Sequence, residues 1–214
     1  MNESAGHVPE STSSALQGLT EEVRAKVRLL YQVGSRCFSR REYPRAIEIL
    51  ENVVFFNRDN YRAFSMLGLA HMGIGDLDHA VLYLERCVEI EPMYSKAWNQ
   101  LGNVYRRRGE LFRAVHVFEK AQALDPENVD IAYNLGITYF ETLEYEKAID
   151  NYKKVLEQEG IRGEVLLDIV TCFYRLEEYD KALKYLRRYN ELYPEAKDQT
   201  RLMAVRKLLI SLAT

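Results

Sequence analysis

Apolar residues recur along the chain with the spacing of buried helix faces, and short polar turns interrupt them at regular intervals. Trp98, Leu101 and Tyr105 are three and four positions apart, which is the spacing of one face of an α-helix. Residues 114–121 carry the same spacing after a polar turn at 108–110. The pattern therefore predicts pairs of amphipathic helices joined by tight turns, and the chain as a whole is predicted to be all-α.

This pattern returns every 34 residues, without insertion, over five units. A small residue marks the first helix of each unit: Gly34, Gly68, Gly102 and Gly136, with Val170 in the fifth place. An alanine follows twelve positions later: Ala46, Ala80, Ala114, Ala148 and Ala182. A large apolar residue follows each alanine by four: Leu50, Leu84, Phe118, Tyr152 and Leu186. Because glycine allows close approach of two backbones, we expect each glycine to face the alanine of its partner helix.

Helix boundaries also carry signals. An acidic residue precedes each second helix, in the order Glu42, Asp76, Glu110, Glu144 and Glu178. A carboxylate at this place is expected to cap exposed amides and to favour the helix dipole, by about 0.5–2 kcal/mol. Gly109 is expected to adopt a positive φ in the turn before Glu110. The first helix is expected to start near Thr20, which two acidic residues follow.

These units resemble the tetratricopeptide repeat, whose 34-residue motif reads W-x2-L-G-x2-Y, then A-x3-F, then P. The third unit matches the motif at Trp98, Leu101, Gly102, Tyr105, Ala114, Phe118, Ala121 and Pro126. The resemblance covers Val27 to Ala196, as units 27–60, 61–94, 95–128, 129–162 and 163–196. It implies a right-handed superhelical solenoid of five helix-turn-helix repeats, in which the first helices line a concave groove.

The two ends of the chain differ from the repeats. Residues 1–19 are rich in Ser, Gly, Pro and Glu and lack the features of a secretory signal, so they are expected to form a flexible tail. Residues 20–196 are expected to hold the repeats. Residues 197–214 carry Leu202, Val205, Leu209 and Leu212 on one face and are expected to form a helix that caps the solenoid.

Composition argues against several classes of protein, including nucleic-acid-binding, disulfide-bonded and membrane-spanning proteins. With 29 basic and 32 acidic side chains the formal net charge is −3, which gives no concentrated basic surface for nucleic acid. Cys37, Cys87 and Cys172 are far apart and form no CxxC pair, which fits a reducing compartment better than disulfides or a metal site. No stretch approaches the roughly 20 apolar residues that cross a bilayer, so no membrane insertion is expected. The cytoplasm is the expected location.

In the tetratricopeptide family, motif positions 2, 5, 6, 9, 12 and 13 project into the concave groove, and the resemblance therefore predicts a peptide-binding surface. We expect it to include Arg62, Met66, Leu69, Lys96, Asn99, Asn103, Arg106, Arg107, Tyr133, Asn134 and Ile137. Met66 and Leu69 suggest an adaptable apolar patch. Asn99, Asn103 and Asn134 suggest pairing with the backbone of an extended peptide, because an amide both donates and accepts hydrogen bonds.

The groove charges suggest an oriented ligand. Position 2 is basic in the first three units and acidic in the last two, as Arg28, Arg62, Lys96, Asp130 and Glu164. A peptide with one acidic and one basic end would be steered into a single orientation. A carboxylate clamp of the kind that binds chaperone tails is excluded, because Glu164 and Asp168 stand where that clamp needs cations.

The sequence contains none of the common catalytic or cofactor-binding motifs. No Ser–His–Asp set, paired-carboxylate motif, phosphate-binding glycine loop or HExxH occurs, so neither catalysis nor a cofactor is expected. His71, His79 and His116 show no metal-ligand spacing, and His71 occupies a packing position, so no metal site is expected. The run Arg106–Arg108 fits either an acidic ligand or the C-terminal end of a helix, where cations are favoured.

Three functions remain open. The sequence favours an adaptor or co-chaperone-like module that holds a peptide segment of a partner protein. A self-assembling scaffold is the second, because Leu208 and Ile210 fall off the main stripe of the last helix and would allow a homo-oligomer. The third is a non-catalytic subunit that regulates a separate enzyme.

Overall fold

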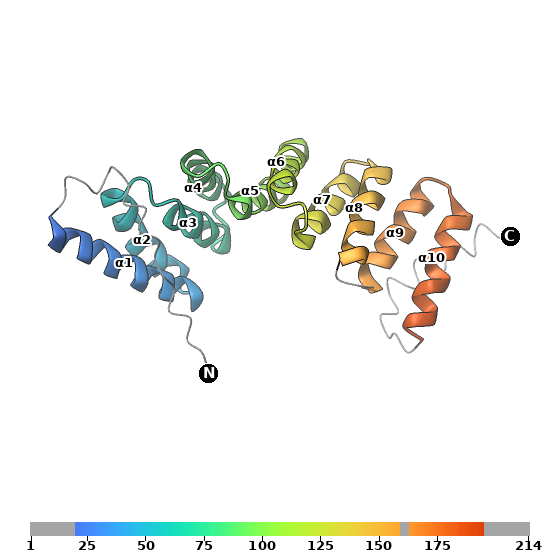
Figure 1. Ribbon diagram of the computed structural model, residues 1–214, viewed down its shortest axis with the longest axis horizontal. Helices are drawn as coiled ribbons and strands as arrows, with labels where there is room; N and C mark the ends of the chain where they lie inside the picture. Colours follow the sequence, from blue (N-terminus) through green and yellow to red (C-terminus); the bar gives the residue numbers. More distant parts are fainter. Residues whose placement is uncertain (1–19, 159–162, 195–214) are drawn as a thin grey trace. The chain divides into compact units, whose positions relative to one another are not determined.

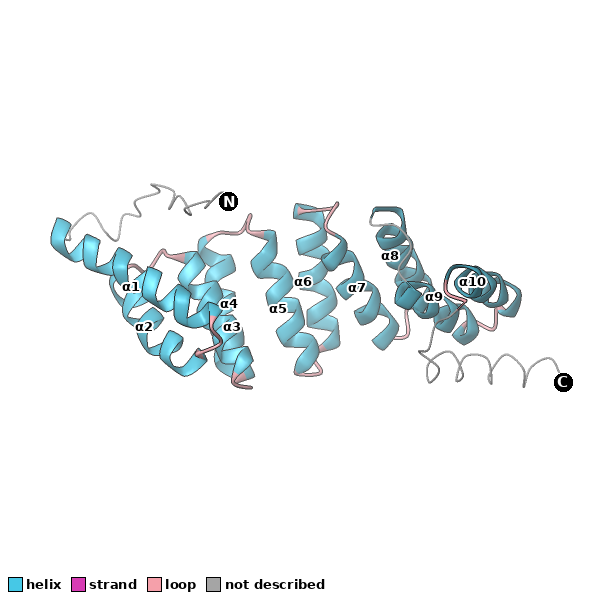
Figure 2. Cartoon of the chain, turned by 90° about the horizontal axis from the view of Figure 1, so that it is seen from below, coloured by secondary structure: helices cyan, strands magenta, loops and turns pink. Residues whose placement is uncertain are grey.

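A computed structural model describes residues 20–158 and 163–194 of the chain. Within these ranges it is all-helical, with ten α-helices and no strand (Figures 1 and 2). In order they are α1 (Glu21–Ser39), α2 (Tyr43–Phe56), α3 (Tyr61–Gly73), α4 (Leu77–Ile90), α5 (Ser95–Arg107), α6 (Leu111–Leu124), α7 (Val129–Glu141), α8 (Tyr145–Gln158), α9 (Gly163–Arg175) and α10 (Tyr179–Leu192). Odd and even helices alternate as the first and second helix of each 34-residue repeat.

The chain forms two compact units whose boundary lies in α5, between Gln100 and Leu101. In the first unit, α2 packs on both α1 and α3, and α3 packs on α4. In the second unit, α6 packs on α7, α7 on α8, α8 on α9 and α9 on α10. Within each unit these helices thus pack on their neighbours in sequence, which is the packing expected of stacked helical repeats.

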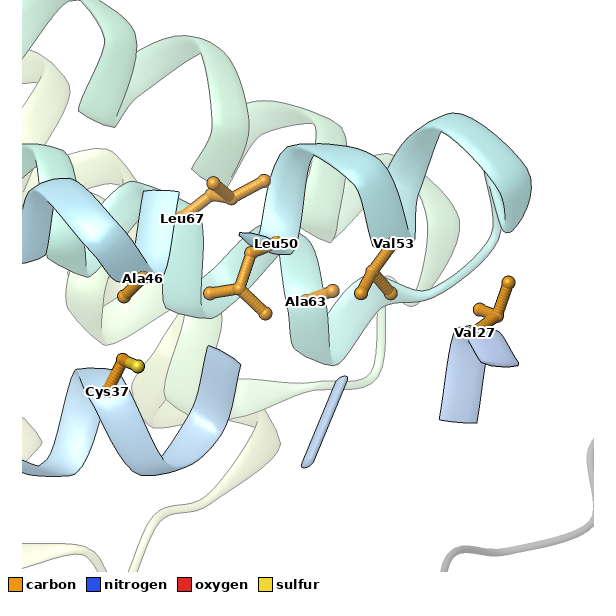
Figure 3. Close-up of a cluster of buried hydrophobic side chains, with 7 residues drawn as sticks. All are labelled: Val27, Cys37, Ala46, Leu50, Val53, Ala63 and Leu67. Atoms are coloured by element: carbon orange, nitrogen blue, oxygen red, sulfur yellow. The ribbon is translucent and has the colours of Figure 1, made fainter. Parts of the chain in front are cut away.

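The core of the first unit shows how one repeat packs on the next. Figure 3 shows seven buried side chains that come together from three helices. They are Val27 and Cys37 of α1, Ala46, Leu50 and Val53 of α2, and Ala63 and Leu67 of α3. Leu50 and Leu67 have no exposed surface, so the second helix of one repeat and the first helix of the next share a single core.

The repeated glycines explain the close helix pairs, although their partner differs from the expected alanine. A Cβ atom on Gly102 would lie 2.6 Å from the ring of Phe118, and one on Gly68 would lie 2.5 Å from Cγ of Leu84. The residue opposite each glycine is therefore the large apolar side chain four positions after the alanine. The alanine is also buried, but it is the large side chain that needs the space left by the missing Cβ.

The turn between the two helices has the same backbone geometry in all five repeats. Each turn has one residue with a φ of 61–85°, namely Arg41, Gly75, Gly109, Leu143 or Glu177. In the second repeat, the N–H of Gly75 bonds to the Met72 carbonyl and the N–H of Asp76 bonds to the His71 carbonyl. Equivalent bonds occur in the other four turns. This pair of bonds is the Schellman motif, and it confirms the positive φ expected of Gly109.

Of the acidic residues expected to cap the second helices, Asp76 does so, but three of the glutamates do not. Asp76 accepts a hydrogen bond from the backbone N–H of His79, as expected. Glu42, Glu110 and Glu178 stand at the same position, but their carboxylates cap no backbone N–H. They pair instead with a base three residues later, such as Arg113 with Glu110 at 2.7 Å.

Several first helices have the side-chain cap that those glutamates lack. Thr20 accepts from the N–H of Val23, which places the start of α1 as expected. Asn60 and Asn128 cap α3 and α7 in the same way. The predicted tail at 1–19 and the predicted capping helix at 197–214, with Leu208 and Ile210, lie outside the described residues.

Candidate functional site

The face of α3 in the first unit joins a cation to two half-buried apolar side chains. Arg62 is exposed, and its Nε atom donates to the Tyr61 hydroxyl at 3.1 Å while the guanidinium lies 5.6 Å from the centre of that ring. Tyr61 in turn packs edge-on against Tyr94, with ring centres 5.1 Å apart. Met66 and Leu69 follow Arg62 along the helix and keep part of their surface exposed. This face therefore offers a fixed positive charge beside an apolar strip.

The start of α5 also belongs to the first unit. Lys96 is exposed and Asn99 is half-buried, so both retain surface that a ligand can reach. Gln100 stands at motif position 6, one of the positions that face the groove in the family, but it is buried and accepts a hydrogen bond from the Ser65 hydroxyl at 2.7 Å. Gln100 thus links the first helices of two successive repeats and is not available to a ligand.

In the second unit, the end of α5 presents Asn103 and the two arginines predicted for the groove. Arg107 is exposed, whereas Asn103 and Arg106 are half-buried. Arg106 forms an ion pair with Glu141 of α7 at 3.3 Å, which occupies part of its hydrogen-bonding capacity. The basic run at this helix end is therefore partly neutralised by a neighbouring repeat.

The face of α7 combines an aromatic, an amide and an aliphatic side chain, all half-buried: Tyr133, Asn134 and Ile137. The Tyr133 hydroxyl donates to Oδ2 of Asp168 at 3.4 Å. Asp168 is buried, so Glu164 is the exposed acid of α9. Asp168 links two repeats, as Gln100 does in the first unit.

The predicted residues share one property that their neighbours lack. All eleven keep exposed or half-buried surface, whereas Leu67 and Ala70 of α3 and Leu135 of α7 are buried between them. The three asparagines are half-buried and not fully exposed as a solvated surface would be. The five charged residues at motif position 2, three basic and then two acidic from Arg28 to Glu164, are all exposed.

A second arrangement recurs at the inter-helix turns, and sequence reasoning missed it. Motif positions 11, 16 and 19 come together there as an aromatic ring, an acid and a cation. Arg113 lies 4.1 Å above the centre of the Tyr105 ring, and Lys147 lies 5.1 Å above that of Tyr139. The cation also pairs with the acid, as Arg113 does with Glu110. Comparing the same three positions across the repeats would have revealed the arrangement.

The second repeat carries two histidines in this arrangement. His71 on α3 and His79 on α4 both direct Nδ1 toward Oδ2 of Asp76, at 3.2 Å and 2.7 Å. Their rings are stacked, with centres 5.1 Å apart. His71 is buried, and its Nε2 atom has no hydrogen-bond partner among the described residues. The sequence spacing of these histidines is not that of metal ligands, but the turn brings both of them to Asp76.

The three cysteines are free and buried, as expected of a chain without disulfides. The Cys87 thiol donates to the Tyr61 carbonyl at 3.1 Å. Burial raises the pKa of Cys87 and of Cys172 to about 12. Such thiols remain protonated near neutral pH and are poor nucleophiles.

No helix among the described residues is both long and apolar enough to cross a membrane.

Comparison with solved structures finds the same fold in several MamA proteins. The crystal structure of MamA protein superposes with a TM-score of 0.74 at 22% identity, covering 79% of this chain and 92% of that one. MamA 41-end from Desulfovibrio magneticus RS-1 gives 0.73 at 20% identity, covering 81% and 98%. MamA AMB-1 gives 0.72 at 23% identity, covering 84% and 98%. At these identities the likeness shows the fold.

Family comparison agrees with the repeat pattern. No curated protein sequence matches the chain. The family described as "Tetratricopeptide repeat protein 21 C-terminal ARM domain" matches residues 9–170, and the family described as "Tetratricopeptide repeat" matches residues 144–205. The first match alone spans most of the chain. The chain therefore belongs to the tetratricopeptide-repeat family and is a protein-interaction module of that family.

Proposed function

We propose that this chain is an adaptor that holds a peptide segment of a partner protein on the exposed faces of its first helices. The observation that carries the proposal is that all eleven predicted residues keep accessible surface beside fully buried packing residues. In a repeat protein the packing positions explain the fold, so the remaining accessible positions on one face are available for recognition. The chain itself is proposed to bind its partner and not to catalyse a reaction.

In the first unit, the proposed ligand segment is acidic and partly apolar. Arg62 and Lys96 are exposed cations at the same motif position of successive repeats, and Met66 and Leu69 supply apolar surface beside Arg62. In the second unit, Asp130 and Glu164 are exposed acids at that position. They favour a basic segment there. In each unit, complementary charge on the bound segment would speed its association at low salt.

The cytoplasm is the proposed setting. Three free, buried cysteines support a compartment in which thiols stay reduced. Self-association through residues 197–214 and regulation of a separate enzyme remain predictions from the sequence.

Photo-crosslinking tests the proposed binding face even while the partner is unidentified. A photoreactive phenylalanine analogue replaces Arg62 or Lys96 in two variants, and Leu82 of α4 in a matched control, since Leu82 is 58% exposed and carries no predicted role. Each full-length variant is illuminated in cells of the source organism, and mass spectrometry identifies the attached peptides. The proposal expects one partner segment, enriched in acidic residues, at both α3 and α5 positions and not at Leu82.

A charge-reversal series then measures the contribution of the cations to binding of the identified segment. Arg62→Glu and Lys96→Glu should each weaken binding and reduce its dependence on salt. Arg86→Glu on α4 changes the net charge equally and should leave binding unchanged. Crosslinks found only from Leu82, or equal losses in all three variants, would place the binding surface elsewhere.

A further inference from the structure

The turn of the second repeat differs from the other four in the chemistry of its side chains. At motif positions 11 and 19 the other repeats carry Cys37 with Arg45, Tyr105 with Arg113, Tyr139 with Lys147, and Phe173 with Lys181. The second repeat has a histidine at both positions, with Asp76 between them in the sequence. Among the described repeats, this is the only turn at which two imidazoles and a carboxylate meet.

The three side chains already converge on one point. Oδ2 of Asp76 lies 3.2 Å from Nδ1 of His71 and 2.7 Å from Nδ1 of His79, and the three ligand atoms lie within 4.8 Å of one another. A tetrahedral Zn²⁺ ion about 2.0–2.1 Å from each ligand atom needs those atoms about 3.3 Å apart. The His71–Asp76 separation meets this value. The His79–Asp76 separation is about 0.6 Å shorter than this value, and the His79 side chain is 56% exposed, so its ring has room to adjust.

The backbone holds the ligands in place before any ion binds. The N–H of Asp76 bonds to the His71 carbonyl at 2.9 Å, which fixes the distance between the two chain segments. Oδ1 of Asp76 accepts the backbone N–H of His79 at 3.2 Å, so Oδ2 is the oxygen that faces the histidines. The buried His71 ring packs on Tyr83, with ring centres 5.2 Å apart, and the Tyr83 hydroxyl donates to Glu51. This packing restrains the orientation of the His71 ring.

We propose that His71, Asp76 and His79 bind a divalent transition-metal ion of the zinc class, with solvent as the fourth ligand. Imidazole nitrogen and carboxylate oxygen are the ligands that such ions prefer when thiolates are absent. The cluster is open to solvent on the side of Asp76 and His79, which gives the ion a route of entry. The bound ion joins the end of α3 to the start of α4. Arg62, Met66 and Leu69 lie on α3, and α4 packs against that helix.

The sister repeats provide variants that separate metal binding from a simple ion pair. His79→Lys installs the residue found at position 19 of the fourth and fifth repeats, which keeps a cation beside Asp76 but removes a metal ligand. His71→Tyr installs the residue found at position 11 of the third and fourth repeats. Asp76→Asn retains a good N-cap and removes the charged oxygen ligand. Each variant is expected to fold, because its turn keeps the backbone hydrogen bonds shared by all five repeats.

The matched control replaces the chain's two other histidines. His7 and His116 complete the set of four, and the double variant H7Q/H116Q leaves His71 and His79 in place. All proteins are prepared at full length without a histidine tag. Isothermal titration with ZnCl₂ gives stoichiometry and affinity, Co²⁺ gives the visible absorption bands of a tetrahedral site, and thermal melts report stabilisation of the folded state.

The proposal expects one Zn²⁺ per chain in the wild type and in H7Q/H116Q, with a higher melting temperature when the ion is present. His79→Lys and His71→Tyr should weaken binding by about tenfold or more, and Asp76→Asn should also weaken it. Should His71→Tyr fail to fold, His79→Lys, whose side chain is exposed, decides the question. The proposal is overturned if the wild type shows no saturable binding, or if H79K binds the ion as tightly as the wild type does.

Discussion

The hydroxyl of Ser65 in α3 donates a hydrogen bond to the side-chain oxygen of Gln100 in α5, with the two oxygens 2.7 Å apart, and both side chains are buried. In the second unit, Tyr133 of α7 contacts Asp168 of α9 at the same pair of motif positions, 5 and 6. Each contact joins residues 35 apart in sequence, one more than the repeat length. Polar side chains on the first helices therefore link one repeat to the next.

Removing one partner of this link should destabilise the first unit. Ser65→Ala leaves the Gln100 oxygen buried without its donor, and the free energy of unfolding should fall by about 1–3 kcal/mol. Urea unfolding followed by circular dichroism measures the change. The double variant S65A/Q100L should lose less than the sum of the two single losses, because neither polar group then remains unpaired. Additive losses would show that the two side chains do not depend on each other.

Leu143 carries a positive φ of 67° in the fourth turn, where the second and third repeats have glycine. Leu143→Gly should raise the free energy of unfolding by roughly 0.5–1 kcal/mol, because relief of the backbone strain exceeds the added entropy of the unfolded chain. The side chain is 69% exposed, so its removal costs little packing. Chemical denaturation of the full chain measures the gain.

The same substitution inside a helix provides the control. Leu82 of α4 is 58% exposed, and Leu82→Gly should lower the free energy of unfolding by about 1 kcal/mol. If both variants were destabilised equally, strain at Leu143 would not be a significant part of the folded state.

The positions of the helix caps predict an asymmetry between asparagine and glutamate. Asn128 accepts a backbone hydrogen bond at the start of α7, so Asn128→Ala should cost about 1 kcal/mol. Glu110 caps no backbone N–H, and its ion pair with Arg113 is partly exposed, so Glu110→Ala should cost between about 0 and 1 kcal/mol. Thermal melts of the two variants side by side compare the losses. A larger loss for Glu110→Ala would contradict the assignment.

The sequence predicted the repeat, the helix pairs and the start of α1 because these depend on local periodicity and on small residues at fixed positions. It was wrong about the glutamate caps: the longer carboxylates of Glu42, Glu110 and Glu178 pair with a base three residues later and accept no backbone N–H, whereas Asp76 does both. It also paired each glycine with the alanine, whereas the longer side chain of Phe118 or Leu84 reaches the open space. In both cases the contact depends on how far a side chain reaches, which the spacing of apolar residues does not show.

The candidate binding face was predictable only in outline. The family motif identifies positions that packing does not use, and all eleven residues keep accessible surface. Burial of Gln100 and Asp168 was not predictable, since each is paired with a residue in the preceding repeat. The histidine pair was hidden for a similar reason. His71 and His79 are eight residues apart on different helices, and only the geometry of the turn brings both to Asp76.

Thiol chemistry offers a prediction with a defined pH dependence. Because burial raises the pKa of Cys87 and Cys172 to about 12, roughly one thiol in ten thousand is ionised at pH 8. The native chain should react very slowly with an aromatic disulfide reagent, and its rate should still rise with pH up to pH 10. In denaturant all three cysteines should react rapidly. Rapid release of one equivalent from the native chain would mean that Cys37 is accessible, although it is buried here.

The turn geometry shared by all five repeats depends on main-chain hydrogen bonds and tolerates arginine, glycine, leucine or glutamate at its left-handed residue. Because side chains do not define the bend, substitution can change what the bend presents without refolding the helices on either side. The five repeats of this chain accordingly keep the same backbone at the bend and differ in the side chains that it carries. One repeat has a cation over an aromatic ring and another has two imidazoles at the same bend, so new recognition properties can be engineered at these bends one repeat at a time.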